Sequence, residues 1–550
     1  MKKKRLEQSN NFWADFVAAL AAGVIATGVM LFLSVVSSGV SLPETFGSDL
    51  TALMPPSLFN YLHETIGGDA KHYLFYGILV GQCVVFAFSG ALYNRLVNRQ
   101  NRRLEWFDGL LLALILWLFA GVILLPISGA GIFGANLNTG FINGLLSLAI
   151  VGIVFGSLFV LFQRWIAARM SRRDARGSES RSLDELEQPY GTMSRRTVLK
   201  NGAIVTGIVL AGVVAWRFIT AGVSTSTVPV NQLLEHFKSK IVPPPTPNYG
   251  EIQQVQFLSP EVTSNDQFYI VSKNLFSDPT VNGNTWRLTV DGQVDNPFTL
   301  NYQELLAQPM KQQYESLMCI SNEVGGQYMS NALWEGIPLM NLLQRAGIKT
   351  GATKVVFHAA DDYTDSIHLT KALEPTTLLA VRMNGVTLPQ GHGFPVRMLV
   401  PGIYGMKHCK WLTHIEVVNY DFQGYWQQRG WSDPAPVRLT ARIDAPLTGS
   451  TAAANRMVYI AGVAFSGNKG ISEVDVSTDA GQTWQRATLK QPLSGLTWVL
   501  WELAWQPPKA GGYTVIARAI DLEGNVQNPN EEPPLPNGSS GYHSIMLNVS

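Results

Sequence analysis

Two stretches of this chain carry the residue types best suited to chemistry. The first, Leu317–Gly326, reads LMCISNEVGG and holds a lone cysteine, Cys319. The second begins at His392, about seventy residues later, and continues through Arg397 and an apolar strand to Lys410. A thiolate is a ligand for soft metals, and arginine and lysine side chains bind phosphate. The pattern therefore suits a metal-bound thiolate beside an anionic, phosphate-bearing cofactor.

Each of these residues also has an ordinary structural interpretation. An isolated cysteine is by default a buried packing residue, and a single His, Arg or Lys is commonly a satisfied, ion-paired or surface group. The Ser-Asn-Glu turn and the two glycines after Cys319 are unlike a core strand. Gly402 and Gly405 would let backbone N–H groups approach an anion closely. The grouping of these residues favours the cofactor interpretation.

At these motifs the chain resembles the sulfite-oxidase-like family of molybdopterin oxidoreductases, from about Phe268 to the end of the sequence. The resemblance implies a molybdenum-dependent oxidoreductase with a molybdenum–molybdopterin cofactor. Cys319 matches the family's metal-binding, catalytic cysteine. The residues that match the family's pterin contacts in this region are His392, Arg397, His408, Cys409 and Lys410. The Cys409 side chain is expected to pack and not to bind the metal.

Further positions match the family one by one. Asp361 matches a pterin contact of relatives, with Asp362 as the alternative alignment. Tyr363 is either the active-site tyrosine or a strand aromatic residue. The early cofactor contacts of the family fall on Tyr269, Ser272 and Lys273.

The sequence also departs from the family. Sulfite oxidases proper follow the metal cysteine closely with an arginine that helps to hold the anionic substrate, whereas this chain has Asn322 and Glu323 there. An acidic side chain facing the metal would repel sulfite, which puts sulfite itself in doubt. Arg429 is either a replacement cation or a residue of a structural turn. No haem segment of the cytochrome b5 type is present, so a separate cytochrome or quinone-linked electron partner is expected.

Composition bounds the remaining possibilities. The chain has 550 residues, too many for one ordinary core, and we expect at least two domains. Its 41 basic and 40 acidic residues give a formal charge of +1, which offers no case for nucleic acid as a partner. Three cysteines cannot make a disulfide framework. Cys83 lies in an apolar run and is expected to be a packing residue.

Long apolar stretches dominate the N-terminal part. Five of them are near the length of about 20 residues that crosses a bilayer as a helix, and they lie at 16–36, 73–92, 110–127, 141–162 and 203–220. Basic residues cluster in alternate loops. By the positive-inside rule, the N-terminus is cytoplasmic and everything after the fifth span is extracytoplasmic. The sequence predicts a multi-pass protein of the cell membrane, in contact with lipid.

The basic segment before the fifth stretch has a second interpretation. Residues 194–200 read SRRTVLK and resemble a twin-arginine export signal, which carries a folded domain across the membrane. The alternative is an ordinary basic flank of a helix. The membrane part contains only His63 and His72 as histidines, both near the predicted outer surface. The spans are therefore expected to anchor the protein and not to carry a haem.

We predict four parts along the chain. A membrane region with five helices covers 1–222, and a linker covers 223–251. An α+β molybdopterin-binding oxidoreductase domain covers 252–433, with strands at 267–274 and 286–294 and helices at 301–307 and 339–346. An all-β immunoglobulin-like sandwich covers 434–550, with strands at 457–465, 471–477 and 513–519. It resembles the family's C-terminal domain, which commonly mediates dimerisation, so the resemblance implies a homodimer.

The leading hypothesis is thus a membrane-anchored, extracytoplasmic molybdopterin oxidoreductase that catalyses two-electron oxygen-atom transfer on a small substrate. A sulfoxide- or N-oxide-type reductase on the same fold is the first alternative. A cofactor-free binding or scaffold module is the second, and it predicts no molybdenum and no effect of replacing Cys319. A transporter is less favoured, because the apolar stretches lack buried charge and obvious internal repeats.

Overall fold

The structure is a computed structural model that describes residues 12–37, 39–55, 58, 61–62, 70–100, 102–137, 140–179, 252–274 and 277–550. The chain divides into two compact units, a helical one formed mostly by residues before 227 and a β-rich one that contains 278–550. The predicted fifth span at 203–220, the SRRTVLK motif at 194–200 and the linker at 223–251 lie outside the described residues.

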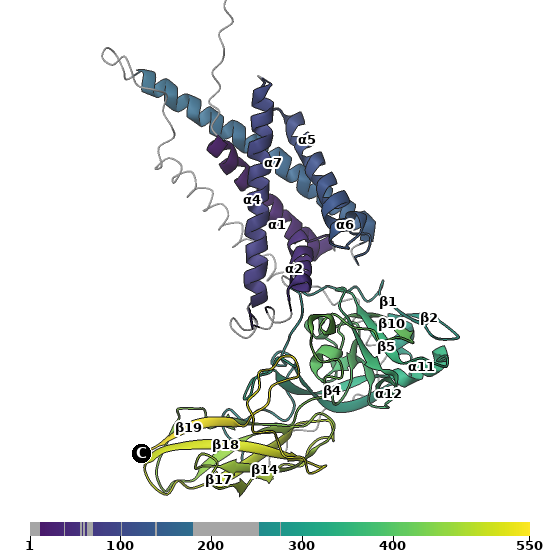
Figure 1. Cartoon of the computed structure of the whole chain (residues 1–550), viewed down its shortest axis with the longest axis vertical. Coiled ribbons are helices and arrows are strands. Elements are labelled where there is room, and N and C mark those ends of the chain that lie inside the picture. Colours follow the sequence, from purple (N-terminus) through teal and green to yellow (C-terminus); the bar gives the residue numbers. More distant parts are fainter. Residues whose placement is uncertain are drawn as a thin grey trace, which may run out of the picture. The chain divides into compact units, whose positions relative to one another are not determined.

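The helical unit is a bundle of long apolar helices (Figure 1). Its elements are α1 (Phe12–Ser37), α2 (Leu42–Leu53), α4 (Ala70–Arg99), α5 (Trp106–Leu118), η2 (Phe119–Leu124), α6 (Leu125–Ile127), η3 (Ile132–Gly134) and α7 (Gly140–Glu179). Four helical segments are long and apolar enough to cross a membrane, at 12–37, 72–99, 106–127 and 140–168. The first four predicted apolar stretches are therefore helical.

Small residues let these helices pack closely. Ala18, Ala22 and Ala26 of α1 are fully buried in one cluster with Phe155 and Phe159 of α7. On α4, the Cys83 sulfur lies 3.8 Å from the hydroxyl of Thr27. The other faces of the bundle expose large apolar side chains, which is the pattern of a surface that meets lipid.

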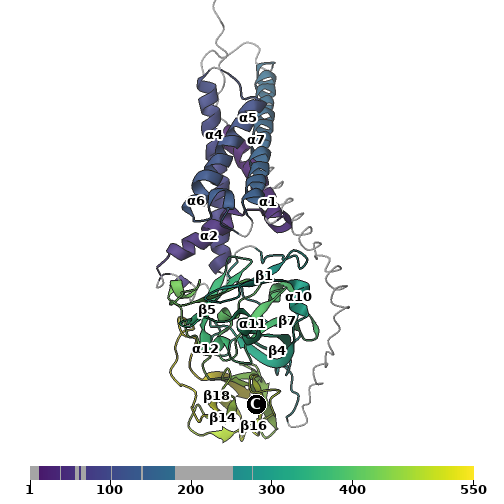
Figure 2. The ribbon, with the colours of Figure 1, turned by 90° about the vertical axis from the view of Figure 1, so that its right-hand side faces the viewer.

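Two five-stranded sheets form the first part of the β-rich unit (Figure 2). One has the order β2-β1-β10-β5-β6, with β1 (Arg287–Gly292), β2 (Phe298–Asn301), β5 (Lys354–Ala359), β6 (Thr364–His368) and β10 (Leu412–Val418). The other has the order β3-β4-β7-β8, with β3 (Lys311–Met318), β4 (Met329–Pro338), β7 (Leu378–Met383), β8 (Val386–Thr387) and β9 (Arg397–Leu399), which pairs with β7. Among the described strands of these two sheets, β1 and β10 pair in parallel and the other pairs are antiparallel.

Short helices and turns connect these strands. They are α10 (Tyr302–Leu306), α11 (Leu339–Ala346), α12 (Leu369–Ala372), η4 (Gln390–His392), η5 (Gly405–Lys407) and η6 (Gln427–Arg429). One apolar cluster joins both sheets, with Val355 and Ile415 from the first and Trp334 and Leu379 from the second. This core fixes the ends of β3, β9 and β10, where the motif residues lie.

The predicted strand at 267–274 is wrong. Its first residues form turns, in which the N–H groups of Gln267 and Phe268 donate to the Ser264 carbonyl at 3.1 and 2.9 Å. The next N–H group, of Tyr269, donates to the Ser330 hydroxyl. Because these donors are used locally or by a side chain, no neighbouring strand can pair with them.

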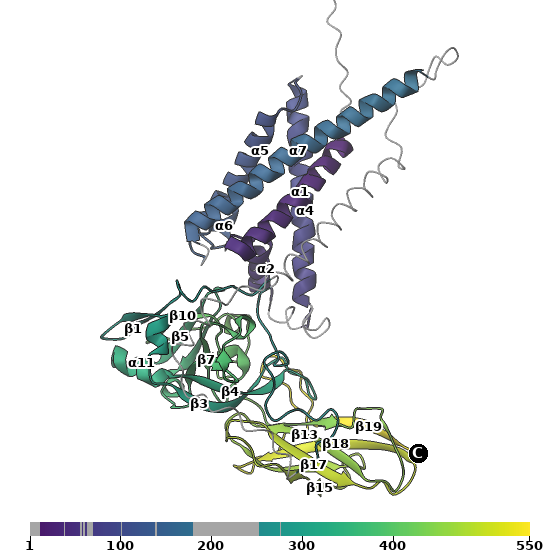
Figure 3. The ribbon, with the colours of Figure 1, turned by 180° about the vertical axis from the view of Figure 1, so that it is seen from behind.

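Two further sheets follow (Figure 3). The four-stranded one has the order β11-β13-β17-β16, with β11 (Thr440–Ala445), β13 (Val458–Phe465), β16 (Thr488–Leu489) and β17 (Val499–Trp505). The five-stranded one has the order β12-β19-β18-β14-β15, with β12 (Thr451–Ala452), β14 (Ile471–Ser477), β15 (Gln485–Arg486), β18 (Gly511–Asp521) and β19 (His543–Val549). Residues of both sheets, such as Trp501 and Val515, share one core.

Candidate active site

Cys319 directly follows β3 and is fixed by its own loop. Its N–H donates to the Tyr328 carbonyl at 3.0 Å, and its sulfur lies 3.0 Å from the Ser321 hydroxyl. The residue is 7% exposed. Burial raises the pKa of the Cys319 thiol, although hydrogen bonds from Ser321 oppose the shift. The thiol is therefore protonated at neutral pH unless a metal cation binds and displaces its proton.

The two residues that depart from the family have different environments. The Asn322 side chain is buried and accepts the Tyr328 N–H at 2.8 Å, which closes the loop after Cys319. The backbone carbonyl of Asn322 accepts a hydrogen bond from the Ser539 hydroxyl at 2.7 Å. The loop after Cys319 therefore also contacts the segment between β18 and β19. Glu323 is exposed. Neither residue supplies a positive charge near Cys319.

Tyr269 approaches the same loop from the other side. A Cβ atom added to Gly405 would lie 2.8 Å from the Tyr269 hydroxyl and 3.3 Å from the Met318 carbonyl, so the three segments meet at this glycine. Burial, and then the charge of a Cys319 thiolate, raises the pKa of Tyr269. The tyrosine thus stays a neutral hydrogen-bond donor close to the candidate metal ligand.

Arg397, the first residue of β9, is a buried cation that forms no ion pair with the residues that the structure describes. It is 6% exposed, and its Nη1 donates to the His392 carbonyl at 3.3 Å. Its Nε has no hydrogen-bond partner among the described residues. The guanidinium lies 5.3 Å from the Trp334 ring centroid. Burial lowers the pKa of Arg397 to about 10, and the side chain remains charged at neutral pH.

His392 and Lys410 flank Arg397. The His392 Nε2 lies 2.9 Å from the Asn265 carbonyl, and burial lowers the pKa of this histidine to about 4. The Lys410 ammonium donates to the Gly391 carbonyl at 3.0 Å and lies 4.2 Å from the Trp411 ring centroid. Gly393 has φ +112°, and a Cβ atom there would lie 2.9 Å from the Lys410 Cβ and 3.1 Å from the Arg397 Cβ. The motif's glycine therefore lets the two cationic residues pack together.

The remaining residues of the 408–410 segment are satisfied by protein. The His408 Nδ1 accepts the Val400 N–H at 3.4 Å, and its Nε2 lies 3.2 Å from the Ile403 carbonyl. Burial lowers the pKa of His408 to about 3. Cys409 is 1% exposed and belongs to the apolar core that joins the two sheets. The side chains of His408 and Cys409 thus shape the segment, while Lys410 projects beside Arg397.

A buried carboxyl group that interacts electrostatically with Arg397 is absent from the residues that the sequence predicts for the site. Glu315 of β3 is 1% exposed, and its Oε2 accepts the Gln313 amide at 2.8 Å. Its Oε1 has no hydrogen-bond partner among the described residues and lies 3.9 Å from the His408 Nδ1. Burial raises the pKa of Glu315 to about 8. Glu315 is therefore mostly neutral at pH 7 and cannot serve as a full counter-charge.

Asp361 and Tyr363 shape a turn between β5 and β6. The Asp361 carboxylate accepts the Tyr363 N–H at 3.2 Å, while Asp362 has a positive φ of 61° and is exposed. The Tyr363 hydroxyl lies 2.9 Å from the Asp365 carboxylate and 2.8 Å from the Met406 carbonyl. Its hydroxyl therefore contacts η5, the turn that precedes His408.

Lys273 and a second buried arginine, Arg429, both lie near the ring of Tyr425. The Lys273 ammonium is 5.4 Å from the Tyr425 ring centroid, and the Arg429 guanidinium is 3.5 Å from the same ring. Arg429 is 5% exposed, and its Nε has no hydrogen-bond partner among the described residues. Ser272 is half-buried next to Lys273. These residues gather positive charge around one aromatic ring.

The arrangement fits an anionic metal cofactor. A buried guanidinium without a counter-ion is costly, and an anion bound at Arg397 would remove that cost. The described residues contain no group of three or more His, Cys, Asp or Glu side chains that could hold a metal ion. Since these residues offer no such group, a metal at Cys319 would need further ligands from elsewhere, such as the sulfur atoms of a pterin cofactor.

Comparisons with known proteins point to the same class of cofactor. Residues 276–426 match the family model described as "Oxidoreductase molybdopterin binding domain", and residues 442–533 match "Mo-co oxidoreductase dimerisation domain". Sulfite oxidase of Rattus norvegicus is 31% identical over 340 residues, which are 52% of this chain and 62% of the rat protein. This chain thus spans less than two thirds of the rat protein's length.

Two other relatives match a larger share of their own length. Sulfite oxidase of Arabidopsis thaliana is 29% identical over 351 residues, which are 52% of this chain and 87% of the plant protein. The uncharacterized oxidoreductase YuiH of Bacillus subtilis is 32% identical over 146 residues, which are 26% of this chain and 72% of the bacterial protein.

Proposed function

Since the chain belongs to the sulfite-oxidase-like family of molybdenum-dependent, molybdopterin-binding oxidoreductases, we propose that it transfers an oxygen atom between water and a small substrate in a two-electron reaction. One observation carries this proposal: a buried thiol, Cys319, occurs in the same β-rich unit as a buried arginine, Arg397, whose Nε has no hydrogen-bond partner among the described residues. The thiol would bind the metal, and the arginine would bind the anionic part of the pterin.

The other predicted residues have graded roles in this proposal. Lys410 and the backbone around Gly393 and Gly405 would surround the anionic cofactor; their close packing with Arg397 and with Tyr269 supports this role. Tyr269 would donate a hydrogen bond near the metal. The side chains of His392, His408 and Cys409 would fix the shape of the cradle, and Asp361, Ser272 and Lys273 would lie at its edge. We assign no proton transfer to Tyr363, because its hydroxyl contacts Asp365 and Met406.

The surroundings of Cys319 would keep water out of the reaction. Its neighbours Met318 and Ile320 belong to one apolar cluster with Tyr404, Met406 and Trp431. A low dielectric constant strengthens the attraction between a bound anion and Arg397. When bound, the molybdenum cofactor supplies the two-electron redox chemistry. The protein's part is to hold the metal through one thiolate, to orient the pterin and to exclude water.

The direction of the reaction separates the two leading candidates. Sulfite oxidation needs an anion site for the substrate, but Asn322 closes its loop and Glu323 is acidic. This observation favours the second candidate, a reductase of sulfoxide- or N-oxide-type substrates. The test is turnover by the full chain, purified in detergent from cells that make molybdopterin. We would measure sulfite oxidation with ferricyanide, and sulfoxide and N-oxide reduction with a reduced dye. Molybdenum-loaded protein inactive in all three assays would contradict the proposal.

The proposed location is the cell membrane. Four apolar helices of sufficient length support anchoring, and the basic loops support a fifth span at 203–220, a cytoplasmic N-terminus and an extracytoplasmic catalytic part. The SRRTVLK motif at 194–200 would then act as a twin-arginine export signal. Protease added to spheroplasts should cleave residues after 251 if this topology holds. Protection of these residues in intact spheroplasts, with cleavage after lysis, would contradict it.

Partners and domain organisation complete the proposal. The match of residues 442–533 to a dimerisation domain supports a homodimer, formed by an immunoglobulin-like domain at 434–550. The molybdopterin-binding domain would cover 252–433, after a linker at 223–251 and a membrane region at 1–222. Electrons would pass to or from a separate cytochrome or quinone-linked protein. Sedimentation of the detergent-purified protein would show whether it is a dimer.

A further inference from the structure

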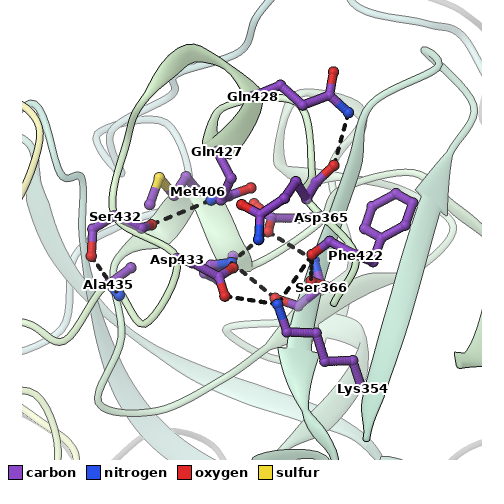
Figure 4. Close-up of polar contacts among 12 residues, drawn as sticks. Lys354, Asp365, Ser366, Met406, Phe422, Gln427, Gln428, Ser432, Asp433 and Ala435 are labelled. Carbon is purple, nitrogen blue, oxygen red and sulfur yellow. Dashed lines mark hydrogen bonds and ion pairs between the residues drawn. The ribbon is translucent and has the colours of Figure 1, made fainter. Parts of the chain in front are cut away.

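A network of buried charges lies next to the cofactor-binding segment (Figure 4). The Lys407 ammonium lies 2.7 Å from the Asp365 Oδ1 and 2.9 Å from the Asp433 Oδ1, and it donates to the Ser366 carbonyl at 2.9 Å. Lys407 is 1% exposed and Asp365 is fully buried. All three N–H groups of this ammonium therefore have acceptors.

A second lysine extends the network toward the surface. The Lys354 ammonium lies 2.5 Å from the Asp421 Oδ1 and 2.7 Å from the Asp433 Oδ2, and it donates to the Phe422 carbonyl at 3.1 Å. Asp433 thus bridges the two lysines with its two oxygens. Burial alone would raise the pKa of Asp433, but the hydrogen bonds from Lys354 and Lys407 hold it below its ordinary value.

The network connects four segments that are far apart in sequence. Lys354 begins β5, Asp365 lies on β6, Lys407 ends η5, and Asp433 follows η6. A second contact ties η5 to β6, because the Tyr363 hydroxyl bonds both the Met406 carbonyl and the Asp365 carboxylate. Two consecutive residues of the turn, Met406 and Lys407, are thereby fixed to one strand.

The turn fixed in this way stands between the two halves of the candidate site. On one side, Gly405 packs against the Tyr269 hydroxyl and the Met318 carbonyl, next to Cys319. On the other side, the chain continues through His408 and Cys409 to Lys410, which packs beside Arg397 at Gly393. A shift of the turn would therefore move the metal side and the pterin side relative to each other.

We infer that Lys407 is a positioning residue, which sets the 405–410 segment so that the Cys319 loop and the Arg397–Lys410 pair face one cofactor. The inference rests on the proposed molybdopterin function. It assigns Lys407 no contact with the cofactor, since its three N–H groups are bonded to Asp365, Ser366 and Asp433. The effect of Lys407 reaches the site only through the position of the turn.

The test compares Lys407→Met with Lys354→Met in the full chain, produced in cells that make molybdopterin. Both variants remove one ammonium group from the same network, but only Lys407 lies in the 405–410 segment. We expect Lys407→Met to lose molybdopterin at least about tenfold faster during buffer exchange, the size typical of an outer-sphere residue. Lys354→Met should keep the wild-type rate. The melting temperatures of both cofactor-free variants should fall to a similar degree.

Two further variants keep the test decisive if Lys407→Met does not fold. Tyr363→Phe removes only the hydroxyl that ties Met406 to Asp365, and it should raise the loss rate several-fold. Lys407→Arg should restore much of the retention. In the loaded protein, the paramagnetic resonance of Mo(V) should change in Tyr363→Phe and stay unchanged in Lys354→Met, a readout that general destabilisation would not produce.

The outcomes separate this inference from the proposed function. Wild-type protein without molybdopterin would overturn the proposed function, and this inference with it. Wild-type protein that is loaded, together with Lys407→Met and Tyr363→Phe variants that retain the cofactor and its spectrum, would overturn only the positioning role. Equal losses in the Lys407 and Lys354 variants would also overturn it, because the effect would then follow stability and not the turn.

Discussion

Two polar regions of the β-rich unit differ in how completely the protein satisfies them. In the network of Lys354, Asp365, Lys407 and Asp433, each ammonium group has three acceptors. Around Arg397, by contrast, the guanidinium Nε and the Glu315 Oε1 have no hydrogen-bond partner among the described residues. Both regions are buried, so exposure to bulk solvent does not explain the difference.

The difference shows which region is made for a ligand. Buried polar groups of folded proteins are almost always hydrogen-bonded, and an unpaired one calls for an explanation. The closed network can only support its neighbours, whereas the open region at Arg397 has an unused donor for an anion. The lone thiol of Cys319 is similar, because a single ligand cannot hold a metal without a cofactor.

Removing the charge of Arg397 should have the largest effect on pterin retention. Arg397→Met deletes a charge-assisted donor, a bond of about 1.5–3 kcal/mol, and we expect pterin retention to fall by roughly 10- to 100-fold. The measurement is pterin content after gel filtration of the full chain. Arg438→Met is the matched control, because Arg438 forms an exposed ion pair with Glu532. Equal retention in both variants would show that Arg397 binds no anion.

The unpaired carboxyl group should make stability depend on pH. The pKa of Glu315 is about 8 in the folded protein and 4.5 in the unfolded chain, so its contribution is present below 4.5 and is lost as pH rises toward 8. His408 has the opposite effect. Its pKa is about 3 in the folded protein and 6.5 in the unfolded chain, so its burial lowers the unfolding free energy only as pH falls below 6.5.

Between pH 6.5 and 8, Glu315 therefore changes the unfolding free energy and His408 does not. In this range the unfolding free energy of the cofactor-free protein should fall with pH, and Glu315→Gln should reduce that slope. Denaturant titrations at several pH values give the slope for both proteins. Identical slopes would mean that Glu315 titrates normally and that the region behind Arg397 is open to water.

The close packing at Gly393 offers a milder way to disturb Arg397 and Lys410. Gly393→Ala adds a Cβ atom 2.9 Å from the Lys410 Cβ at a residue with φ +112°, at a cost of about 1–2 kcal/mol for the left-handed backbone alone. We expect a lower melting temperature and faster loss of pterin. Gly495→Ala is the control, because no atom lies within 4 Å of its added Cβ. An unchanged loss rate in Gly393→Ala would separate this glycine from the cofactor site.

The smallest effect is expected at the substrate side. Glu323→Arg would restore the positive charge that sulfite oxidases proper carry there. For an exposed group, such a change is worth about 1 kcal/mol, so KM for sulfite should fall by roughly fivefold. Glu323→Gln should produce a smaller change in the same direction, and high salt should diminish both effects. No effect of either substitution on KM would place Glu323 outside the substrate path.

The sequence predicts one of these two regions far better than the other. Cys319, His392, Arg397 and Lys410 fall into two short motifs that resemble the sulfite-oxidase-like family, so the sequence alone suffices to propose them as site residues. Lys354, Asp365, Lys407 and Asp433 come from four separate segments. The pairing of β5 with β6 brings the first two together, and ion pairs join Lys407 and Asp433 to them. Spacing along the chain carries no signal for such a network.

Secondary structure shows the same division between local and distant causes. The helix predicted at 339–346 coincides with α11, and the strand predicted at 457–465 differs from β13 by one residue. Their apolar periodicity is a local property. The strand predicted at 267–274 failed because turn bonds to Ser264 and the contact with Ser330 use its donors. Only the fold reveals that Ser330 is near.

The most direct test of the account is the molybdenum and pterin content of the full chain, purified in detergent from cells that make molybdopterin, beside a Cys319→Ser variant. The account predicts close to one molybdenum and one pterin per wild-type chain, and an altered molybdenum spectrum or loss of the metal in the variant. Folded wild-type protein without metal and pterin would contradict the account and favour a cofactor-free binding module.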